Sequence, residues 1–190
     1  MIEKIINQSI LSLVEGDITQ ETTNAIVNAA NSSLMGGGGV DGAIHMAGGP
    51  KILEECKNIR AQSGRLPAGQ AAITTAGSMK TRFVIHTVGP IWHNGDKNEP
   101  EILASCYQMS LKIAEENGCK SISFPSISTG AYGYQVSLAA PVAINTVVDF
   151  LMKDTAIQLI RFVLFSSRVF DAYAEAVRQR VEVGCSDLRK

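Results

Sequence analysis

Amide and carboxylate side chains frame a run of four glycines in the first quarter of the chain. Asn28 and Asn31 bracket two alanines, glycines fill positions 36–39, and Asp41 follows after Val40. Four consecutive glycines leave a surface without Cβ atoms, so their backbone N–H groups can approach phosphate oxygens closely. A flexible linker is the alternative, but the residues after the glycines resemble the start of a helix. The pattern therefore predicts an anion-binding site.

A second loop of small, hydroxylated and glycine residues supports this interpretation. Residues 122–125 read as a short buried strand, and residues 126–134 follow it before a helical pattern that begins at Leu138. Because ligands of open α/β sheets bind outside the carboxyl ends of strands, two such loops can clamp a diphosphate. The chain has neither GxGxxG immediately after a strand nor GxxxxGKS/T, since residues 37–42 match the first pattern only at a distance from the expected strand 25–28. This argues against ordinary dinucleotide-binding and P-loop sites.

The composition favours one globular domain. The chain has 190 residues, of which 45% are hydrophobic, and this suffices for a single core. A net charge of -1 provides no general attraction to polyanions, so we expect neither long nucleic acid nor a membrane as a partner. The first residues lack the apolar core of a signal peptide, and we expect a cytoplasmic protein. Four cysteines without metal-ligand spacing predict reduced thiols and no metal site.

Strands rich in Ile, Val, Phe and Thr must position the two loops, and they alternate with helical patterns. The expected strands span residues 9–15, 25–28, 70–75, 82–87, 121–125 and 159–165. The expected helices span residues 41–47, 50–63, 101–116, 138–152 and 170–183. This alternation predicts an α/β fold in which a mostly parallel sheet is covered by helices on both faces.

Six motifs in one order carry a resemblance to a known family: Gly16–Thr19, Ile26–Asn31, Gly36–His45, Leu66–Gly69, Ile85–Pro90 and Phe124–Tyr134. The chain resembles the macrodomain family, specifically its MacroD-type branch, over about residues 10–180. The resemblance implies a three-layer α/β/α sandwich with a mixed, mostly parallel central sheet, formed by a single macrodomain over residues 1–190. It also implies binding of ADP-ribose, release of mono-ADP-ribose from acidic side chains of proteins, and deacetylation of O-acetyl-ADP-ribose, with no metal or cofactor.

The resemblance assigns catalysis to Asn31 and Asp41. Asn31 would hold the distal ribose, and Asp41 would orient or deprotonate a water, or polarise a ribose hydroxyl. From the residues alone, Asp41 is equally suited to the first turn of a helix and Asn31 to a turn. His45 follows Asp41 by four residues and shares its helix face, but the family pattern does not require a catalytic histidine.

The remaining ligand contacts are also implied by the resemblance. Asp17 would accept a hydrogen bond from the adenine N6 amine, and Phe165 would contact the adenine ring, whereas a turn cap and core packing are their alternative roles. Tyr134 would either close over the ribose or pack beneath its loop. The other implied contacts, with the backbone as the main donor, are Ile18, Gly38, Gly39, Val40, Ser128, Thr129, Gly130, Ala131 and Tyr132.

Two functional hypotheses compete at this point. One is a hydrolase that acts on ADP-ribose esters, and the other is a non-catalytic module that reads ADP-ribose marks. A reader needs contacts to phosphate and adenine but no acid beside the distal ribose. The presence of both Asn31 and Asp41 therefore favours the hydrolase.

Overall fold

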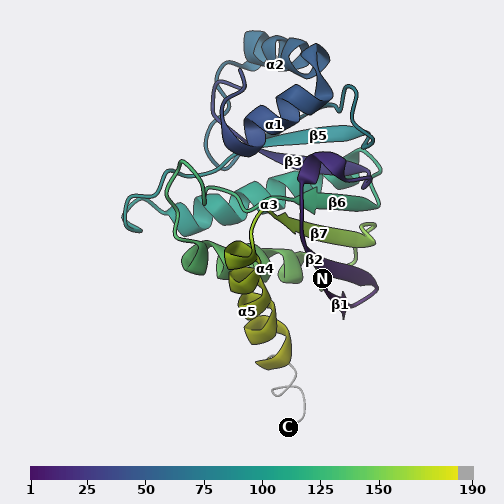
Figure 1. Cartoon of the computed structure of the whole chain (residues 1–190), viewed down its shortest axis with the longest axis vertical. Coiled ribbons are helices and arrows are strands. Elements are labelled where there is room, and N and C mark those ends of the chain that lie inside the picture. Colours follow the sequence, from purple (N-terminus) through teal and green to yellow (C-terminus); the bar gives the residue numbers. More distant parts are fainter. Residues whose placement is uncertain (184–190) are drawn as a thin grey trace.

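A seven-stranded mixed sheet forms the centre of the protein (Figure 1). The structure is a computed structural model and describes residues 1–183. The strand order is β1-β2-β7-β6-β3-β5-β4, with β1 and β4 antiparallel to their neighbours at the two edges and the other five strands parallel. The strands are β1 (Ile2–Ile6), β2 (Ser9–Glu15), β3 (Ala25–Ala30), β4 (Ala71–Thr75), β5 (Phe83–Val88), β6 (Ser121–Phe124) and β7 (Leu159–Leu164).

Helices cover both faces of this sheet. The helices of one face are α3 (Glu99–Glu116), α4 (Val136–Leu151) and α5 (Ser167–Val183). The other face carries the short 3-10 helix η1 (Ile18–Gln20) together with α1 (Gly39–Gly48) and α2 (Pro50–Ser63). The predicted three-layer α/β/α sandwich with a mixed, mostly parallel sheet is therefore confirmed.

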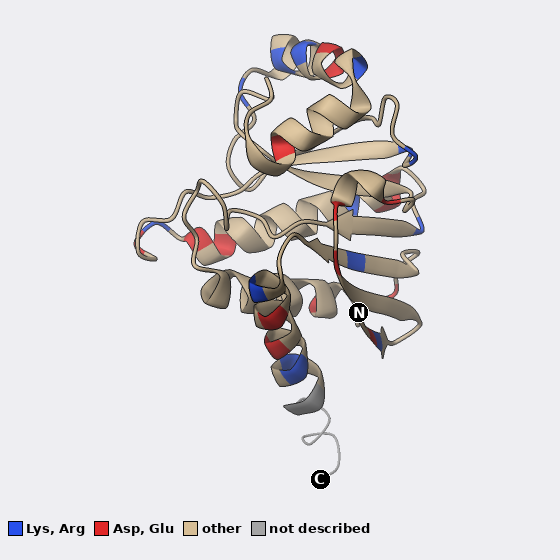
Figure 2. Ribbon diagram, viewed as in Figure 1, with Lys and Arg blue, Asp and Glu red and all other residues tan. Residues whose placement is uncertain are grey.

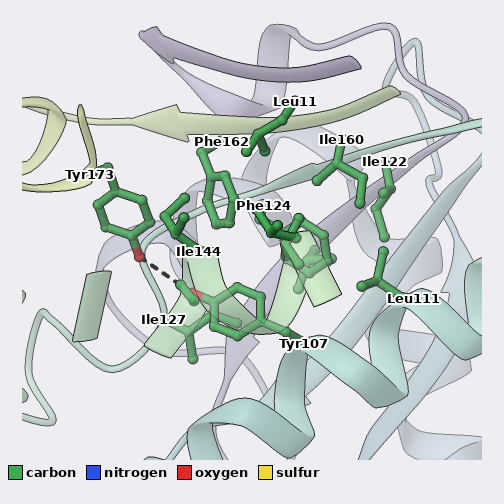
Figure 3. Close-up of a cluster of buried hydrophobic side chains, with 14 of the residues drawn as sticks. Leu11, Tyr107, Leu111, Ile122, Phe124, Ile127, Ile144, Ile160, Phe162 and Tyr173 are labelled. Atoms are coloured by element: carbon green, nitrogen blue, oxygen red, sulfur yellow. Dashed lines mark hydrogen bonds between the residues drawn. The ribbon is translucent and has the colours of Figure 1, made fainter. Parts of the chain in front are cut away.

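Each face of the sheet buries its own apolar core. The larger core, under α3, α4 and α5, has an aromatic centre in which the ring centroids of Tyr107 and Phe124 lie 5.2 Å apart (Figure 3). Phe162 and Tyr173 extend it, with their centroids 5.0 Å apart. The hydroxyl oxygens of Tyr107 and Tyr173 lie 3.3 Å from each other, so these polar tips have a partner inside the core. This packing fixes α3, α4 and α5 on the sheet.

The parallel register brings the carboxyl ends of five strands to one edge of the sheet. β3 pairs with β5 from Ala25 opposite Phe83 to Ala30 opposite Val88. β7 pairs with β2 on one side and with β6 on the other. The loops that leave these strands therefore converge at one edge, where open α/β sheets bind their ligands.

The observed elements match most of the predicted ones. The bounds of β2 and α2 agree with the prediction, and the other elements differ by a few residues at their ends. Strand β1 and helix η1 were not predicted. β1 is a short edge strand whose residue types do not alternate between apolar and polar as in a half-buried strand. Lys4 takes a partly buried position, whereas Ile5 is 79% exposed.

Charge distribution, cysteines and helix hydrophobicity can be compared with what the composition predicts. Figure 2 shows Lys and Arg interspersed with Asp and Glu along α2 and α5, so neither helix carries a stripe of one sign. Cys56, Cys106 and Cys119 are buried free thiols, whereas Cys185 lies outside the described residues. Along residues 1–183, no helix combines the length and the apolar character needed to cross a bilayer.

Candidate active site

A cavity of about 730 Å³ opens at the carboxyl ends of the parallel strands. Ligand pockets in proteins enclose about 300–1,000 Å³, so this volume suits a nucleotide-sized ligand. The loops after β2, β3, β6 and β7 form its walls, together with Gly89 after β5. Both glycine-containing loops predicted to bind an anion are among these walls.

The N-terminus of α1 presents unpaired backbone donors on one wall. No side chain caps the helix at Gly38. The N–H groups of residues 39–41, in its first turn, donate to no acceptor within residues 1–183. A Cβ atom at Gly38 would meet no atom of the described residues within 4 Å, so space remains in front of this backbone. Free N–H groups and the helix dipole together make a helix N-terminus an anion-binding site.

The loop between β6 and α4 supplies donors on the facing wall. Ser128 adopts a left-handed conformation with a φ of 65°. For the N–H groups of residues 129–132, the described part of the chain offers no hydrogen-bond acceptor. The loop is tied to the core, because the Tyr173 hydroxyl donates to Ser126 Oγ at 3.1 Å and Thr129 Oγ1 donates to the same oxygen at 2.8 Å. The two walls can therefore hold a diphosphate between backbone donors.

Asp41 and Asn31 lie side by side where the first glycine loop enters α1. Asp41 is 4% exposed, and its Oδ2 lies 3.4 Å from Asn31 Nδ2. Asn31 also donates to the Gly36 carbonyl at 2.8 Å and accepts from the Ser33 N–H at 2.9 Å. These contacts fix the orientation of the amide. The structure thus brings together, on the cavity wall, the two residues that were predicted to be catalytic.

Asp17 and Phe165 lie together on the cavity lining, after β2 and β7. Asp17 caps η1, since its Oδ1 accepts hydrogen bonds from the Thr19 N–H at 2.9 Å and the Thr19 hydroxyl at 2.8 Å. No described residue donates to Oδ2, so the cap leaves one carboxylate oxygen for a ligand. Phe165 is 90% exposed, which excludes core packing and leaves its ring available to stack on a planar group.

A family model described as Macro domain matches residues 27–143 of the chain. The chain belongs to the macrodomain family. It is 54% identical over 169 residues to a macro domain-containing protein of Caldanaerobacter subterraneus subsp. tengcongensis, and the alignment covers 89% of this chain and 96% of that protein. It is 49% identical over 173 residues to a protein of Citrobacter koseri named O-acetyl-ADP-ribose deacetylase, with coverage of 91% and 98%.

Solved structures of other macrodomains share this fold. The Oceanobacillus iheyensis macrodomain with ADP has a TM-score of 0.92 and 46% sequence identity, and the match covers 96% of this chain and 97% of that one. The Trypanosoma brucei macrodomain in complex with ADP-ribose has a TM-score of 0.80 and 36% identity, with coverage of 88% and 68%. These likenesses confirm the predicted fold family.

Beneath Asp41, a line of buried polar side chains continues into the macrodomain interior. Asn28 Nδ2 lies 2.7 Å from Asp41 Oδ1 and 3.0 Å from His86 Nδ1. His86 Nε2 lies 2.9 Å from Thr74 Oγ1. Burial and, to a smaller extent, the nearby His45 lower the pKa of His86 to about 3, so its ring is neutral at physiological pH. This network was not predicted from the sequence, because the strand register creates it by placing Asn28 opposite His86.

His45 and Cys56 lie around the same network. His45 Nε2 is 3.4 Å from Asp41 Oδ1, as the four-residue spacing on one helix face allows. This is an ion-pair distance, but within residues 1–183 the nitrogen Nε2 of His45 makes no hydrogen bond. His45, Cys56 and His86 bring potential metal-ligand atoms within 4.8 Å of one another. Burial, and then the charges of Asp41 and Glu55, raise the pKa of the Cys56 thiol to about 11, and both ring nitrogens of His86 already have partners. We therefore propose no metal at this cluster.

Tyr134 does not reach the cavity. It is 2% exposed, and its ring packs against Trp92 with the centroids 4.4 Å apart. Its ring therefore packs beneath the loop, and we leave it out of the proposed ligand-binding set. The other residues that were predicted to bind the ligand line the cavity: Asp17, Ile18, Gly38, Gly39, Val40, Ser128, Thr129, Gly130, Ala131, Tyr132 and Phe165.

Among residues 1–183, no cationic side chain lines the cavity. Its charged residues are the carboxylates Asp17 and Asp41, and neither Lys nor Arg is part of it. Compensation of a negative ligand therefore falls to backbone N–H groups and to the N-terminus of α1.

Proposed function

We propose that this macrodomain binds ADP-ribose and hydrolyses O-acetyl-ADP-ribose to ADP-ribose and acetate. Relatives named O-acetyl-ADP-ribose deacetylase, 49% identical over 98% of their length, support the reaction. Macrodomain structures with ADPR or ADP-ribose bound support the ligand. The observation that carries the proposal is the buried Asp41 carboxylate beside the open N-terminus of α1, on the wall of a nucleotide-sized cavity.

In the proposed complex, the diphosphate lies between the N-terminus of α1 and the loop between β6 and α4. The unpaired N–H groups of both segments support this placement. Adenine lies at the end of the cavity marked by Asp17 and Phe165, where Asp17 Oδ2 accepts from the N6 amine. The distal ribose lies at Asn31 and Asp41. A carboxylate oxygen cannot pair with the keto oxygen of guanine, which favours adenine.

The proposed chemistry is addition of water to an ester. The water oxygen attacks the acetyl carbonyl carbon, the bond from that carbon to the ribose oxygen breaks, and the ribose oxygen takes up a proton. Asp41 orients or deprotonates the water, or polarises a ribose hydroxyl, while Asn31 holds the ribose. A diphosphate fixed by backbone donors keeps the water next to Asp41, so proximity and electrostatics supply most of the rate.

We further propose that the same site releases mono-ADP-ribose from modified Asp and Glu side chains of proteins. The bond to be cleaved is again an ester between an acyl group and ribose, so the same water and the same carboxylate serve. We also propose that residues 1–190 form a single macrodomain and that the protein acts in the cytoplasm. The buried free thiols of Cys56, Cys106 and Cys119 support a reducing compartment.

The test is turnover. Purified protein is incubated with a large excess of O-acetyl-ADP-ribose, and ADP-ribose and acetate are quantified with time by chromatography. A parallel reaction uses a protein that carries mono-ADP-ribose on acidic residues. Product far beyond one equivalent supports a hydrolase, whereas tight ADP-ribose binding without turnover favours a non-catalytic reader. Asp41→Asn, which keeps the size of the side chain and removes its charge, is the matched control.

A further inference from the structure

We infer that Asn28 and His86 are positioning residues that hold the Asp41 carboxylate in place for hydrolysis. The inference rests on the proposed function, because it concerns how the proposed catalytic carboxylate is oriented. The three side chains come from β3, β5 and α1, and Thr74 from β4 closes the outer end of the line. Asp41 is thereby tethered to the central sheet in addition to its own helix.

The direction of each hydrogen bond in this line follows from the donors available. An ionised carboxylate only accepts, so Asn28 donates its amide N–H to Asp41 Oδ1. The same NH₂ group faces His86 Nδ1, so this ring nitrogen is an acceptor without a proton. The ring proton of the neutral imidazole is then on Nε2, from which it is donated to Thr74 Oγ1. Thr74 in turn donates its hydroxyl proton to the Thr75 carbonyl at 2.9 Å.

The protonation pattern of His86 selects one orientation of the Asn28 amide. With a proton on Nδ1, His86 would need an acceptor, and Asn28 would have to turn its carbonyl oxygen toward the ring. Such a flip would replace the donor that faces Asp41 by an oxygen and create repulsion. In the observed orientation, Asn28 Oδ1 is buried without a partner within the described residues, so contacts of the NH₂ group set the orientation.

This arrangement divides the labour between the two oxygens of Asp41. Oδ1 is occupied by Asn28, at 2.7 Å, on the side of the sheet. Oδ2 lies on the side of Asn31, at 3.4 Å, where the distal ribose and the water are proposed to lie. Oδ1 therefore anchors the carboxylate through the shorter hydrogen bond, whereas Oδ2, with the longer contact to Asn31, is the oxygen proposed to act in the reaction. Loss of the anchor should change how Asp41 acts on water more than how the cavity binds ADP-ribose.

Two substitutions at position 86 separate positioning from packing. His86→Leu removes both ring nitrogens, whereas His86→Asn keeps an oxygen acceptor near the position of Nδ1. We expect His86→Leu to lower kcat for O-acetyl-ADP-ribose up to about 100-fold, the effect of a misplacement of about 1 Å, while ADP-ribose Kd stays nearly unchanged. His86→Asn should recover most of kcat. Val84→Ala, buried on the same face of β5, is the control for destabilisation alone and should keep kcat.

Two outcomes of these measurements would overturn the inference. The first is an unchanged kcat in folded His86→Leu. The second is a parallel loss of kcat, affinity and melting temperature in His86→Leu, since it would mean that His86 only fills space. If His86→Leu does not fold, Asn28→Ala and Thr74→Val carry the same comparison of kcat with Kd at the two ends of the line.

The tautomer of His86 gives a readout that does not depend on activity. Nitrogen chemical shifts of the wild-type ring at neutral pH should show a proton on Nε2 and none on Nδ1. A proton on Nδ1 would contradict the inferred orientation of Asn28. A wild-type protein that shows this tautomer but does not turn over O-acetyl-ADP-ribose would refute the proposed function and the catalytic use of the line, while its geometry would stand.

Discussion

At Asp41 three features of the structure act on one carboxylate: burial, the open N-terminus of α1, and amide donors from Asn28 and Asn31. A carboxylate that served only as a helix cap would bond to N–H groups of its own first turn. The hydrogen-bond donors to Asp41 are instead side chains from β3 and the loop after it, and the contact within its own helix is to the His45 ring one turn on. This pattern argues for a role outside helix stability.

The first prediction concerns Asp41. Replacement by Ala should slow hydrolysis by about 10²- to 10⁴-fold, as expected when a positioned acid or base is removed. ADP-ribose affinity should change by only about 1 kcal/mol, because a single ribose contact is lost. Initial rates and calorimetric Kd values measure the two effects separately. Hydrolysis within a few fold of wild type would show that Asp41 has no part in the chemistry.

The second prediction uses the two oxygens of Asp17. Asp17→Ala should weaken ADP-ribose binding by about 1–3 kcal/mol and, through loss of the η1 cap, lower stability by about 1 kcal/mol. Asp17→Asn should preserve the cap through its Oδ1 but still weaken binding, since an NH₂ group cannot accept from the adenine amine. Calorimetry and thermal melting test both. Wild-type affinity in either variant would remove Asp17 from the adenine site.

The individual residues show how far sequence reasoning reached. Asp41 and Asn31 were singled out because they flank a glycine run, and Asp17 because it follows a strand end, but the roles predicted for them came from the family resemblance. Asn28 and His86 are 58 positions apart and meet only through the parallel register of β3 and β5. A polar residue inside each of two buried strands was the only signal at these positions. That the two residues are partners depends on the pairing of β3 with β5, which no short motif encodes.

At the scale of elements, the two facing loops present unpaired backbone N–H groups to the cavity. Gly130 takes no left-handed conformation, and a Cβ atom there would meet no protein atom within 4 Å. The reason for glycine at this position is therefore outside the protein, in the space that the ligand would fill.

The third prediction follows from this open space. Gly130→Glu should leave the melting temperature close to that of wild type and abolish ADP-ribose binding, because the new side chain fills the diphosphate channel and repels its charge. Gln135→Glu, at an exposed position outside the cavity lining, adds the same charge as a control and should bind normally. Micromolar binding by a folded Gly130→Glu protein would contradict the diphosphate clamp.

The fourth prediction tests the link between the core and the second loop. Tyr173→Phe removes the hydroxyl that contacts Tyr107 and donates to Ser126. Stability should fall by about 0.5–1.5 kcal/mol, and ADP-ribose affinity should fall as well because the loop loses its anchor. Urea unfolding and calorimetry measure the two quantities. An unchanged affinity would show that the loop holds its shape without the core.

Boundaries of elements were less predictable than their existence. The interior strands are segments of four to seven residues rich in apolar and β-branched side chains, and this composition identifies them without tertiary information. Strand β1 depends on its pairing with β2, from Ile2 opposite Leu13 to Ile6 opposite Ser9, and only that pairing makes it a strand. The N-terminal ends of α1 and α3 were each predicted two residues too late. The first turn of α1 contains glycine, and the first turn of α3 contains Pro100, so neither turn resembles a helix interior.

The whole molecule has a net charge of -1, and the described residues that line the cavity include neither Lys nor Arg. Ligand binding should therefore depend little on salt. The fifth prediction is that ADP-ribose Kd changes little between about 0.05 and 0.5 M salt, since screening acts most strongly on exposed charge pairs. Titrations at several salt concentrations measure this. A steep rise in Kd with salt would indicate a cationic contact absent from the described lining.

The position of β7 also bears on how the protein is made. β7 is the last strand in sequence, yet it lies between β2 and β6. A nascent chain leaves the ribosome with its N-terminal residues first, so β2 has only β1 as a partner until Leu159–Leu164 have been synthesised. The loop that carries Asp17 follows β2 and the loop that carries Gly130 follows β6, so β7 lies between the strands that hold the two loops. An unfinished chain therefore lacks the part of the cavity wall formed by β7 and the residues after it, and truncated translation products should not bind the proposed ligand.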